Sequence, residues 1–203
     1  MQSLTSVLDT FLFDAKSRRL SSTTQKSYRT TLHWFLTFLQ EIGVSNLEEL
    51  NHIHIRQYLA HLQEKGNKSA TQHDHAKIVR VFCNFCVREE LLKESPFLKV
   101  KMPQLDKLLP VIFTDEEISR VLDACESKRD KALCYLLLDS GMRQSEAIAL
   151  NIEDIDMKTG AVTVLKGKGS KQRIVYIGTK TKRYLTLYFV ERGVTDATKP
   201  VFV

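Results

Sequence analysis

The chain has 203 residues, of which 43% are hydrophobic and 27% are charged, a balance that is ordinary for a globular protein. Its formal net charge of +6 favours an anionic partner, nucleic acid first among them. No apolar run approaches ~20 residues, which excludes a membrane-spanning helix, and the spacing of the four cysteines is not that of a secreted disulfide framework, which predicts reduced thiols and a cytoplasmic location.

The first half of the chain predicts four amphipathic helices. Apolar residues recur at helical spacing, and hydroxyl or amide side chains that can cap a helix precede the second and third of these segments. No glycine or proline interrupts their interiors. The predicted helices cover residues 4–19, 21–43, 51–66 and 69–92. We therefore predict a helical domain over residues 1–94.

Residues 95–113 differ from what precedes them. Three of the four prolines lie here, namely Pro96, Pro103 and Pro110. Proline removes a backbone donor and biases the preceding residue toward extended conformations. The composition predicts an interdomain linker.

The second domain is predicted to span residues 114–203. Thr114 and Glu117 have the spacing of a capping box at the start of a helix. The hydrophobic period then changes, because the segments AVTVL and QRIVYI are rich in β-branched residues and predict two short strands. Helices are predicted over residues 116–125, 129–140, 144–150 and 180–193, strands over 161–165 and 172–177, and the start of another strand at 200–203.

Arg143 follows a glycine, in the segment Ser140-Gly141-Met142-Arg143. The glycine lets the backbone turn sharply after an apolar helix. A guanidinium on such a turn can donate two parallel hydrogen bonds to phosphate oxygens, which lysine cannot. Glu146, one helical turn later, either orients Arg143 or simply pairs with it. A plain surface arginine at the start of a short helix would have the same local sequence.

Lys168 lies between Gly167 and Gly169, in the turn that joins the two predicted strands. An ammonium there can donate a proton to a leaving oxygen or act as a point charge on phosphate. The spacing is not that of a Walker phosphate-binding loop. Between Asp156 and Glu191 the chain has eight basic residues and no acidic one. This run predicts either a polyphosphate ligand or a solvated basic surface.

Arg143 on its glycine turn, the SEAIALNIEDID segment, the KGKGSKQRIVYI hairpin and the basic helix after it resemble the tyrosine recombinase (phage integrase) family, most closely its bacterial chromosome-resolution recombinases and related integrases. The helical first half, the SP…P…LP segment and the TDEE entry to the second domain resemble the same family. The resemblance implies a mainly α fold with a small β-sheet. An N-terminal four-helix core-binding (SAM-like) domain would be followed by part of an α+β catalytic domain.

The resemblance also implies a reaction, DNA breakage and rejoining during integration of a mobile element or during chromosome resolution. In the family a tyrosine attacks the scissile phosphate to form a 3′-phosphotyrosine, without metal or nucleotide cofactor. Arg143 matches the first of two arginines that stabilise the pentacoordinate phosphate. Lys168 matches the general acid, and Glu146 matches an acidic position that supports Arg143. The implied partners are double-stranded DNA at a recombination site and other recombinase subunits.

The family's remaining catalytic parts come later in the chain: a His-x-x-Arg box, a further His or Trp, and the tyrosine nucleophile. Here all six histidines precede residue 76, no arginine follows Arg192 and no tyrosine follows Tyr188. We interpret Tyr184 and Tyr188 as packing and surface residues of a helix. The sequence therefore predicts a polypeptide that binds DNA without cleaving it, either a fragment or the product of a shortened gene.

Several basic residues are expected to contact DNA. The segment RRLSSTTQKSYR is the strongest candidate, because helix N-termini with hydroxyl residues donate to phosphates. Solvated faces are the alternative for part of this set. The predicted DNA-binding residues are Arg18, Arg19, Lys26, Arg29, Arg80, Lys166, Lys171 and Arg173.

A zinc site is not expected. His73 and His75, followed by Cys83 and Cys86, superficially resemble a ligand set. Residues two apart on a helix do not share a face, and structural zinc sites usually place turns between ligand pairs. We predict that the cysteines belong to the helical core.

Two further hypotheses belong to other classes of protein. The chain can be a non-catalytic regulator that occupies recombination sites or pairs with a recombinase, or a helical protein-interaction module with incidental charge. DNA binding that weakens with salt separates the last hypothesis from the others.

Overall fold

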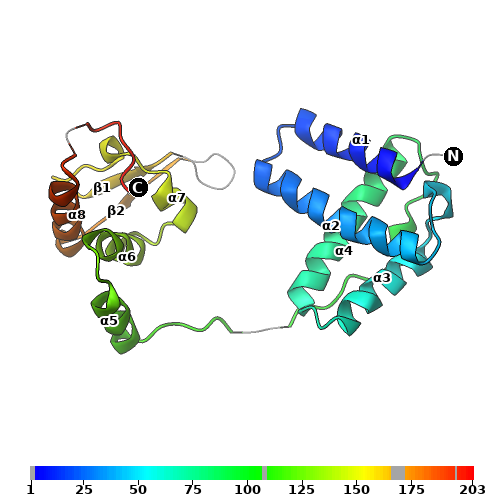
Figure 1. The fold of residues 1–203 in the computed structure, drawn as a ribbon, viewed down its shortest axis with the longest axis horizontal. Helices are drawn as coiled ribbons and strands as arrows, with labels where there is room; N and C mark the ends of the chain where they lie inside the picture. The colour runs from blue at the N-terminus through cyan, green and yellow to red at the C-terminus, as the bar shows by residue number, and fades with distance from the viewer. Residues whose placement is uncertain (1–2, 107–108, 166–171, 195) are drawn as a thin grey trace. The chain divides into compact units, whose positions relative to one another are not determined.

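The computed structural model describes residues 3–106, 109–165, 172–194 and 196–203. The chain divides into two compact units, unit 1 (Met1–Leu109) and unit 2 (Pro110–Val203). The described residues form eight α-helices and a two-stranded sheet (Figure 1). The predicted fold class, mainly α with a small β-sheet, is confirmed. Within the described ranges, no helix combines the length and the apolar character needed to cross a bilayer.

Unit 1 contains the four predicted helices. Hydroxyl and amide caps start two of them: the Ser21 Oγ accepts from the Thr24 N–H at 3.1 Å, and the Asn51 Oδ1 accepts from the Ile53 N–H at 2.8 Å. Such caps satisfy backbone donors that the first helical turn leaves free. The elements are α1 (Leu4–Ser17), α2 (Ser22–Glu41), η1 (Leu47–Glu49), α3 (His52–Glu64), α4 (Ser69–Arg88) and η2 (Pro96–Lys99).

Aromatic side chains fill the centre of unit 1. Phe11 meets Phe82 edge-on at 5.6 Å between ring centroids and Phe85 at 5.2 Å. Cys83 and Cys86 are fully buried on the same face of α4, as predicted, and burial raises the pKa of Cys86 to about 12. The apolar residues that recur at helical spacing in the four helices therefore pack into one shared core.

The segment assigned to the linker begins as part of unit 1. Phe97 and Val100 are buried in its core, in and directly after η2. Arg56 Nη2 donates to the Lys99 carbonyl at 2.6 Å, and the Ser69 hydroxyl donates to the Asp106 carboxylate at 2.6 Å. Prolines exclude a regular helix here, but a short 3₁₀ turn still buries apolar side chains.

Unit 2 packs helices against a small hairpin. A capping box starts its first helix as predicted: Glu117 N–H donates to Thr114 Oγ1 at 3.3 Å, and Thr114 N–H donates to Glu117 Oε2 at 2.9 Å. The predicted strand at 200–203 is wrong in the described structure, where Pro200 forms only an isolated antiparallel bridge with Asn151. The elements are α5 (Asp115–Ala124), α6 (Lys128–Ser140), α7 (Gln144–Ile148), η3 (Ile152–Asp154), β1 (Ala161–Val164), β2 (Arg173–Tyr176) and α8 (Thr179–Arg192).

The hairpin and α8 close the core of unit 2. β1 and β2 are antiparallel, with Val164 paired to Arg173. Val162 on β1, Leu136 on α6 and Leu185 on α8 are fully buried together. This packing places the start of β2 beside the short helix α7.

Phe82→Ala tests the aromatic core of unit 1. We expect it to lower the free energy of unfolding by about 3–5 kcal/mol, because it removes a fully buried ring and leaves a cavity. Phe13→Ala is the matched control, because Phe13 is 73% exposed, and it should cost less than about 1 kcal/mol. Denaturant unfolding of both variants measures the difference, and equal losses would contradict the assignment of the core.

Candidate functional site: an arginine–glutamate cluster

Arg143 lies on a rigid turn between α6 and α7. Gly141 ends α6 with a left-handed backbone, φ 60°, which favours glycine. Met142 is buried and anchors the turn, so that Arg143 becomes the residue that precedes α7. The Asp139 carboxylate accepts hydrogen bonds from the Gly178 N–H and from the Thr181 hydroxyl, which ties the end of α6 to the start of α8.

Glu146 is a buried carboxylate between two arginines. Its residue exposure is only 4%. Arg143 donates to it from the backbone N–H at 2.8 Å and from Nη1 at 2.9 Å. Arg173 donates from Nη1 at 2.8 Å and from Nη2 at 2.7 Å, a bidentate pair. We call Arg143, Glu146 and Arg173 the arginine–glutamate cluster.

These contacts hold Glu146 ionised. The hydrogen bonds from Arg173, then those from the Arg143 backbone and side chain, lower the pKa of Glu146 to about 2 against the opposing effect of burial. The same pairing raises the pKa of Arg173. The carboxylate is therefore charged at every physiological pH.

The role of Arg173 in this cluster was missed in the sequence. Arg173 was predicted as a DNA-binding residue. It lies 27 residues from Glu146 in the sequence, yet in the structure its side chain contacts the Glu146 carboxylate directly. Only the pairing of β1 with β2, and their packing beside α7, brings the two together. The sequence does not reveal this contact, because Glu153, Asp154 and Asp156 lie closer to Arg173 in the chain and are equally acidic.

The arrangement leaves Arg143 available to a ligand. The side chain of Arg143 is 59% exposed. By comparison, the side chain of Arg173 is 36% exposed and that of Glu146 is 2% exposed. Two guanidiniums around one carboxylate leave a net positive charge at the surface, held in place by fixed hydrogen bonds. Such a preorganised cation suits a phosphate oxygen or another developing anion.

Three predicted site residues, Lys166, Lys168 and Lys171, lie outside the described residues. The strands that flank them, β1 and β2, pair at Val164 and Arg173. Their predicted roles stay predictions.

The predicted DNA-binding residues of unit 1 are all exposed. Arg18 and Arg19 follow α1, Lys26 and Arg29 lie on α2, and Arg80 lies on α4. α1 and α2 run side by side (Figure 1), and residues 18–21 connect them.

Two features modify this basic set in unit 1. Arg18 Nη1 lies 3.4 Å from the Asp14 carboxylate, which partly offsets its charge. Arg19 adopts a left-handed backbone, φ 54°, at the turn between the helices. The turn thus presents basic side chains next to the first turn of α2, whose Ser21 cap leaves other backbone donors at that end.

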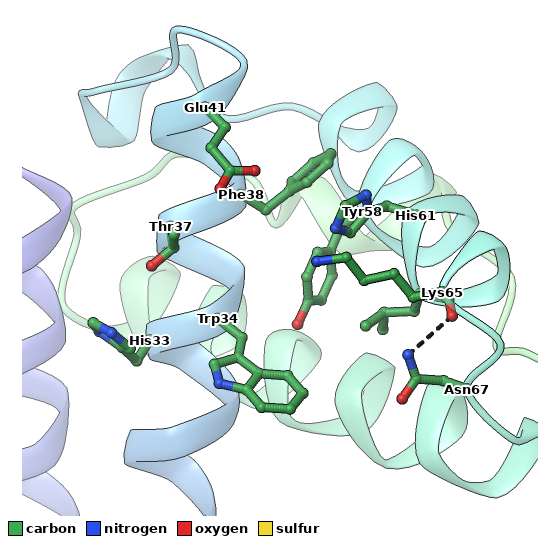
Figure 2. A pocket seen from close by; sticks show the side chains of 10 residues that line it. His33, Trp34, Thr37, Phe38, Glu41, Tyr58, His61, Lys65 and Asn67 are labelled. Atoms are coloured by element: carbon green, nitrogen blue, oxygen red, sulfur yellow. Dashed lines mark hydrogen bonds between the residues drawn. The ribbon is translucent and has the colours of Figure 1, made fainter.

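Unit 1 also has a cavity of about 470 Å³ between α2 and α3 that the sequence did not predict. Figure 2 shows Trp34 and Phe38 from α2 on one side and Tyr58 and His61 from α3 on the other, with Lys65 reaching over the opening. Its lining combines aromatic side chains with the charged Glu41 and Lys65, and none of the predicted site residues belongs to it.

His75, one of the histidines considered for zinc, is buried and engaged elsewhere. Its Nδ1 lies 2.7 Å from the Tyr58 hydroxyl, and burial lowers the pKa of His75 and raises the pKa of Tyr58. Across the part of the chain that the structure describes, no three His, Cys, Asp or Glu side chains gather where they could hold a metal ion.

Comparison with known proteins identifies the family. Residues 112–203 match the profile of the phage integrase family, and residues 8–90 match that of the phage integrase N-terminal SAM-like domain. The chain belongs to the tyrosine recombinase (phage integrase) family. The predicted resemblance is confirmed.

Curated tyrosine recombinases show the same likeness over most of the chain. Tyrosine recombinase XerD of Oceanobacillus iheyensis is 34% identical over 188 residues, covering 90% of this chain and 63% of the relative. Tyrosine recombinase XerC of Bacillus pumilus is 33% identical over 176 residues, covering 84% and 57%. The chain thus spans less than two thirds of the length of these curated tyrosine recombinases.

Solved structures share the fold at low sequence identity. A lambda integrase tetramer bound to a Holliday junction gives a TM-score of 0.80 at 15% identity, covering 98% of this chain and 62% of that one. A lambda integrase(75–356) dimer bound to a COC′ core site gives 0.79 at 16% identity, covering 93% and 70%. The Tn1549 transposon integrase in complex with transposon right end DNA gives 0.72 at 13% identity, covering 100% and 71%.

Glu146→Gln tests the electrostatics of the cluster. A carboxylate whose pKa falls to about 2 on folding stabilises the fold above its unfolded pKa near 4.5, and this contribution is lost as the pH falls through the folded pKa. We expect the variant to be less stable than the parent at pH 7, and the difference to shrink between about pH 4.5 and pH 2.

The measurement is denaturant unfolding across that pH range. Glu153→Gln is the control, because Glu153 is exposed and its substitution should change stability little at any pH. A difference between parent and Glu146→Gln that does not depend on pH would contradict the cluster.

Proposed function

We propose that this chain is the DNA-binding portion of a site-specific tyrosine recombinase, a family whose reaction breaks and rejoins DNA through a 3′-phosphotyrosine. The observation that carries the proposal is the buried Glu146, which holds Arg143 at the surface in a fixed orientation. An ion pair of this geometry presents a guanidinium to an anion without further reorganisation.

In this proposal Arg143 binds the scissile phosphate and Glu146 positions it. Arg173 acts through Glu146, because its bidentate pair keeps that carboxylate charged and in place. In the family's reaction, the position that Lys168 matches is that of the general acid that protonates the leaving oxygen, as the resemblance implies. Lys166 and Lys171 contact the DNA backbone beside it.

Unit 1 would supply a second DNA contact. Arg18, Arg19, Lys26 and Arg29 surround the turn between α1 and α2, and Arg80 lies on α4, which packs against α2. Exposed guanidinium and ammonium groups next to a helix N-terminus suit backbone phosphates. We assign the core-binding role to residues 1–94, the connecting role to 95–113, and the first part of a catalytic domain to 114–203.

The partners proposed are double-stranded DNA and other recombinase subunits. Fold neighbours of this chain are a dimer on a core site, a tetramer on a Holliday junction and an integrase on transposon end DNA. Their fold is shared, and this supports the same class of ligand here. The proposal places the chain in the cytoplasm and requires neither a metal nor an organic cofactor.

We further propose that a polypeptide of these 203 residues binds DNA without cleaving it. All six histidines lie in unit 1, and the late tyrosines serve packing: Tyr188 is buried, and Tyr184 stacks on Tyr135 at 4.4 Å. Neither tyrosine matches the position of the family's nucleophile. In this form the chain would act as a non-catalytic occupant of recombination sites.

Salt dependence tests DNA binding by unit 1. We expect log affinity for duplex DNA to fall linearly with log salt, and Arg29→Ala to reduce the slope by about 1, because one phosphate contact is lost. Lys93→Ala is the control, since Lys93 is exposed but lies outside the predicted set. Fluorescence anisotropy measures both. Absence of binding at about 50 mM salt would favour a helical protein-interaction module instead.

Arg143→Ala tests the cluster in unit 2. We expect duplex affinity to fall about tenfold, because a charge-assisted hydrogen bond to phosphate is worth about 1.5 kcal/mol or more. Arg120→Ala is the matched control, because Arg120 is 77% exposed on α5 and should leave affinity unchanged. The same anisotropy titration compares the two, and equal effects would remove Arg143 from the interface.

A nicked suicide duplex tests the absence of cleavage. We expect the 203-residue chain to form no covalent adduct with a recombination-site DNA, because neither Tyr184 nor Tyr188 matches the position of the family's nucleophile. Denaturing gel electrophoresis of the mixture detects a phosphotyrosyl link directly. A full-length tyrosine recombinase on its own site is the positive control, and an adduct with this chain would overturn the proposal of binding without cleavage.

A further inference from the structure

Two half-buried thiols in unit 2 lie in contact. Cys125 caps the C-terminus of α5 and Cys134 lies on α6, and their Sγ atoms are 3.7 Å apart. The Cys125 thiol also lies 3.3 Å from the Val121 carbonyl. Both cysteines are free and partly exposed. The arginine–glutamate cluster uses neither of them.

The geometry allows these thiols to join. A disulfide needs an S–S separation of about 2.05 Å, so the two sulfur atoms must approach each other from van der Waals contact. α5 can follow such a movement, because none of its residues is buried and Val121 on it is 48% exposed. Cys125 directly follows α5 and Cys134 lies on α6, so the approach does not require a helix to bend within itself.

We propose that Cys125 and Cys134 form a reversible intramolecular disulfide, which makes the junction of α5 and α6 a redox modification site. With hydrogen peroxide as oxidant, the Cys125 thiol loses its proton and the thiolate attacks one peroxide oxygen. The O–O bond breaks, a sulfenic acid forms, and the departing hydroxide takes up the released proton to give water. The Cys134 sulfur then attacks the sulfenic sulfur, and a second water leaves. Two thiols are oxidised, one peroxide is reduced, and thiol reductants reverse the change.

The surroundings set the order of these steps. Burial, and then the hydrogen bond shared with Cys125, raises the pKa of Cys134 to about 11. Cys134 is therefore a poor first nucleophile at neutral pH, because the thiolate is the reactive form. Cys134 acts as the resolving thiol. This role depends mainly on its contact with the oxidised Cys125 sulfur.

Unit 1 provides an internal control. Cys83 and Cys86 have exposures of 0%, and burial raises the pKa of both thiols. They lie within one helix, three residues apart, in the aromatic core. A general oxidant should spare this pair if exposure and geometry decide reactivity.

The disulfide would hold α5 against α6. An apolar groove of about 220 Å³ lies between these helices, lined by Phe113, Ile118, Val121, Cys134, Leu137 and Leu138. A covalent link at one end of the groove restricts opening of α5, the first helix of unit 2. The inference does not depend on the proposed DNA-binding function.

Peptide mapping of the full chain tests the proposal. After treatment with a small excess of hydrogen peroxide and alkylation, trypsin separates Cys125, in peptide 121–128, from Cys134, in peptide 132–143, and leaves Cys83 and Cys86 together in peptide 81–88. We expect a cross-link between the first two peptides that disappears with a thiol reductant. Peptide 81–88 should stay reduced and alkylate at least about tenfold more slowly in the folded protein.

Variants separate this disulfide from other oxidation. Cys125→Ser and Cys134→Ser should each abolish the cross-link, and Cys134→Ser should accumulate sulfenic acid on Cys125, which a dimedone probe detects. The oxidised parent should unfold at a midpoint about 5–10 °C higher than the reduced parent. Cross-links only between separate chains, oxidation of Cys83 and Cys86 at the same rate, or no cross-link in the folded parent would each overturn the proposal.

Discussion

A buried carboxylate held between two guanidiniums is the interaction on which the candidate site depends. Glu146 is almost inaccessible to solvent, and a buried charge is strongly unfavourable unless it is paired and hydrogen-bonded. Four hydrogen bonds from Arg143 and Arg173 meet this requirement. Because the bonds come from a glycine turn and from the first residue of β2, the carboxylate also joins α7 to the hairpin.

The two arginines differ in what they offer. Arg173 commits a bidentate fork to Glu146 and is the less exposed of the pair, whereas Arg143 donates once from its side chain and stays more than half exposed. One arginine therefore positions the carboxylate, and the carboxylate positions the other arginine. This hierarchy leaves one guanidinium oriented at the surface before any anion binds there.

The two units differ in how completely their elements contribute buried residues to a core. Unit 1 has a core of interlocked aromatic rings that reaches into the segment after α4, through Phe97 and Val100. Unit 2 is closed by α6, α8 and the hairpin, but α5 buries no residue of its own. Because α5 buries no residue, a single covalent link to α6 would restrict its movement. The contact between the Cys125 and Cys134 thiols is the place for the disulfide proposed above.

The sequence by itself determined the helices of both units, the caps at Ser21, Asn51 and Thr114, the hairpin strands and the family, because periodicity, capping and motif spacing are local signals. It also singled out Arg143 and Glu146, which lie within one helical turn. Only the tertiary structure decided that Arg173 holds Glu146, that Phe97 belongs to the first core, that Pro200 forms a lone bridge, and that Cys125 touches Cys134. Each of these contacts joins residues from separate elements, and their meeting depends on how whole helices and strands pack, which no local pattern encodes.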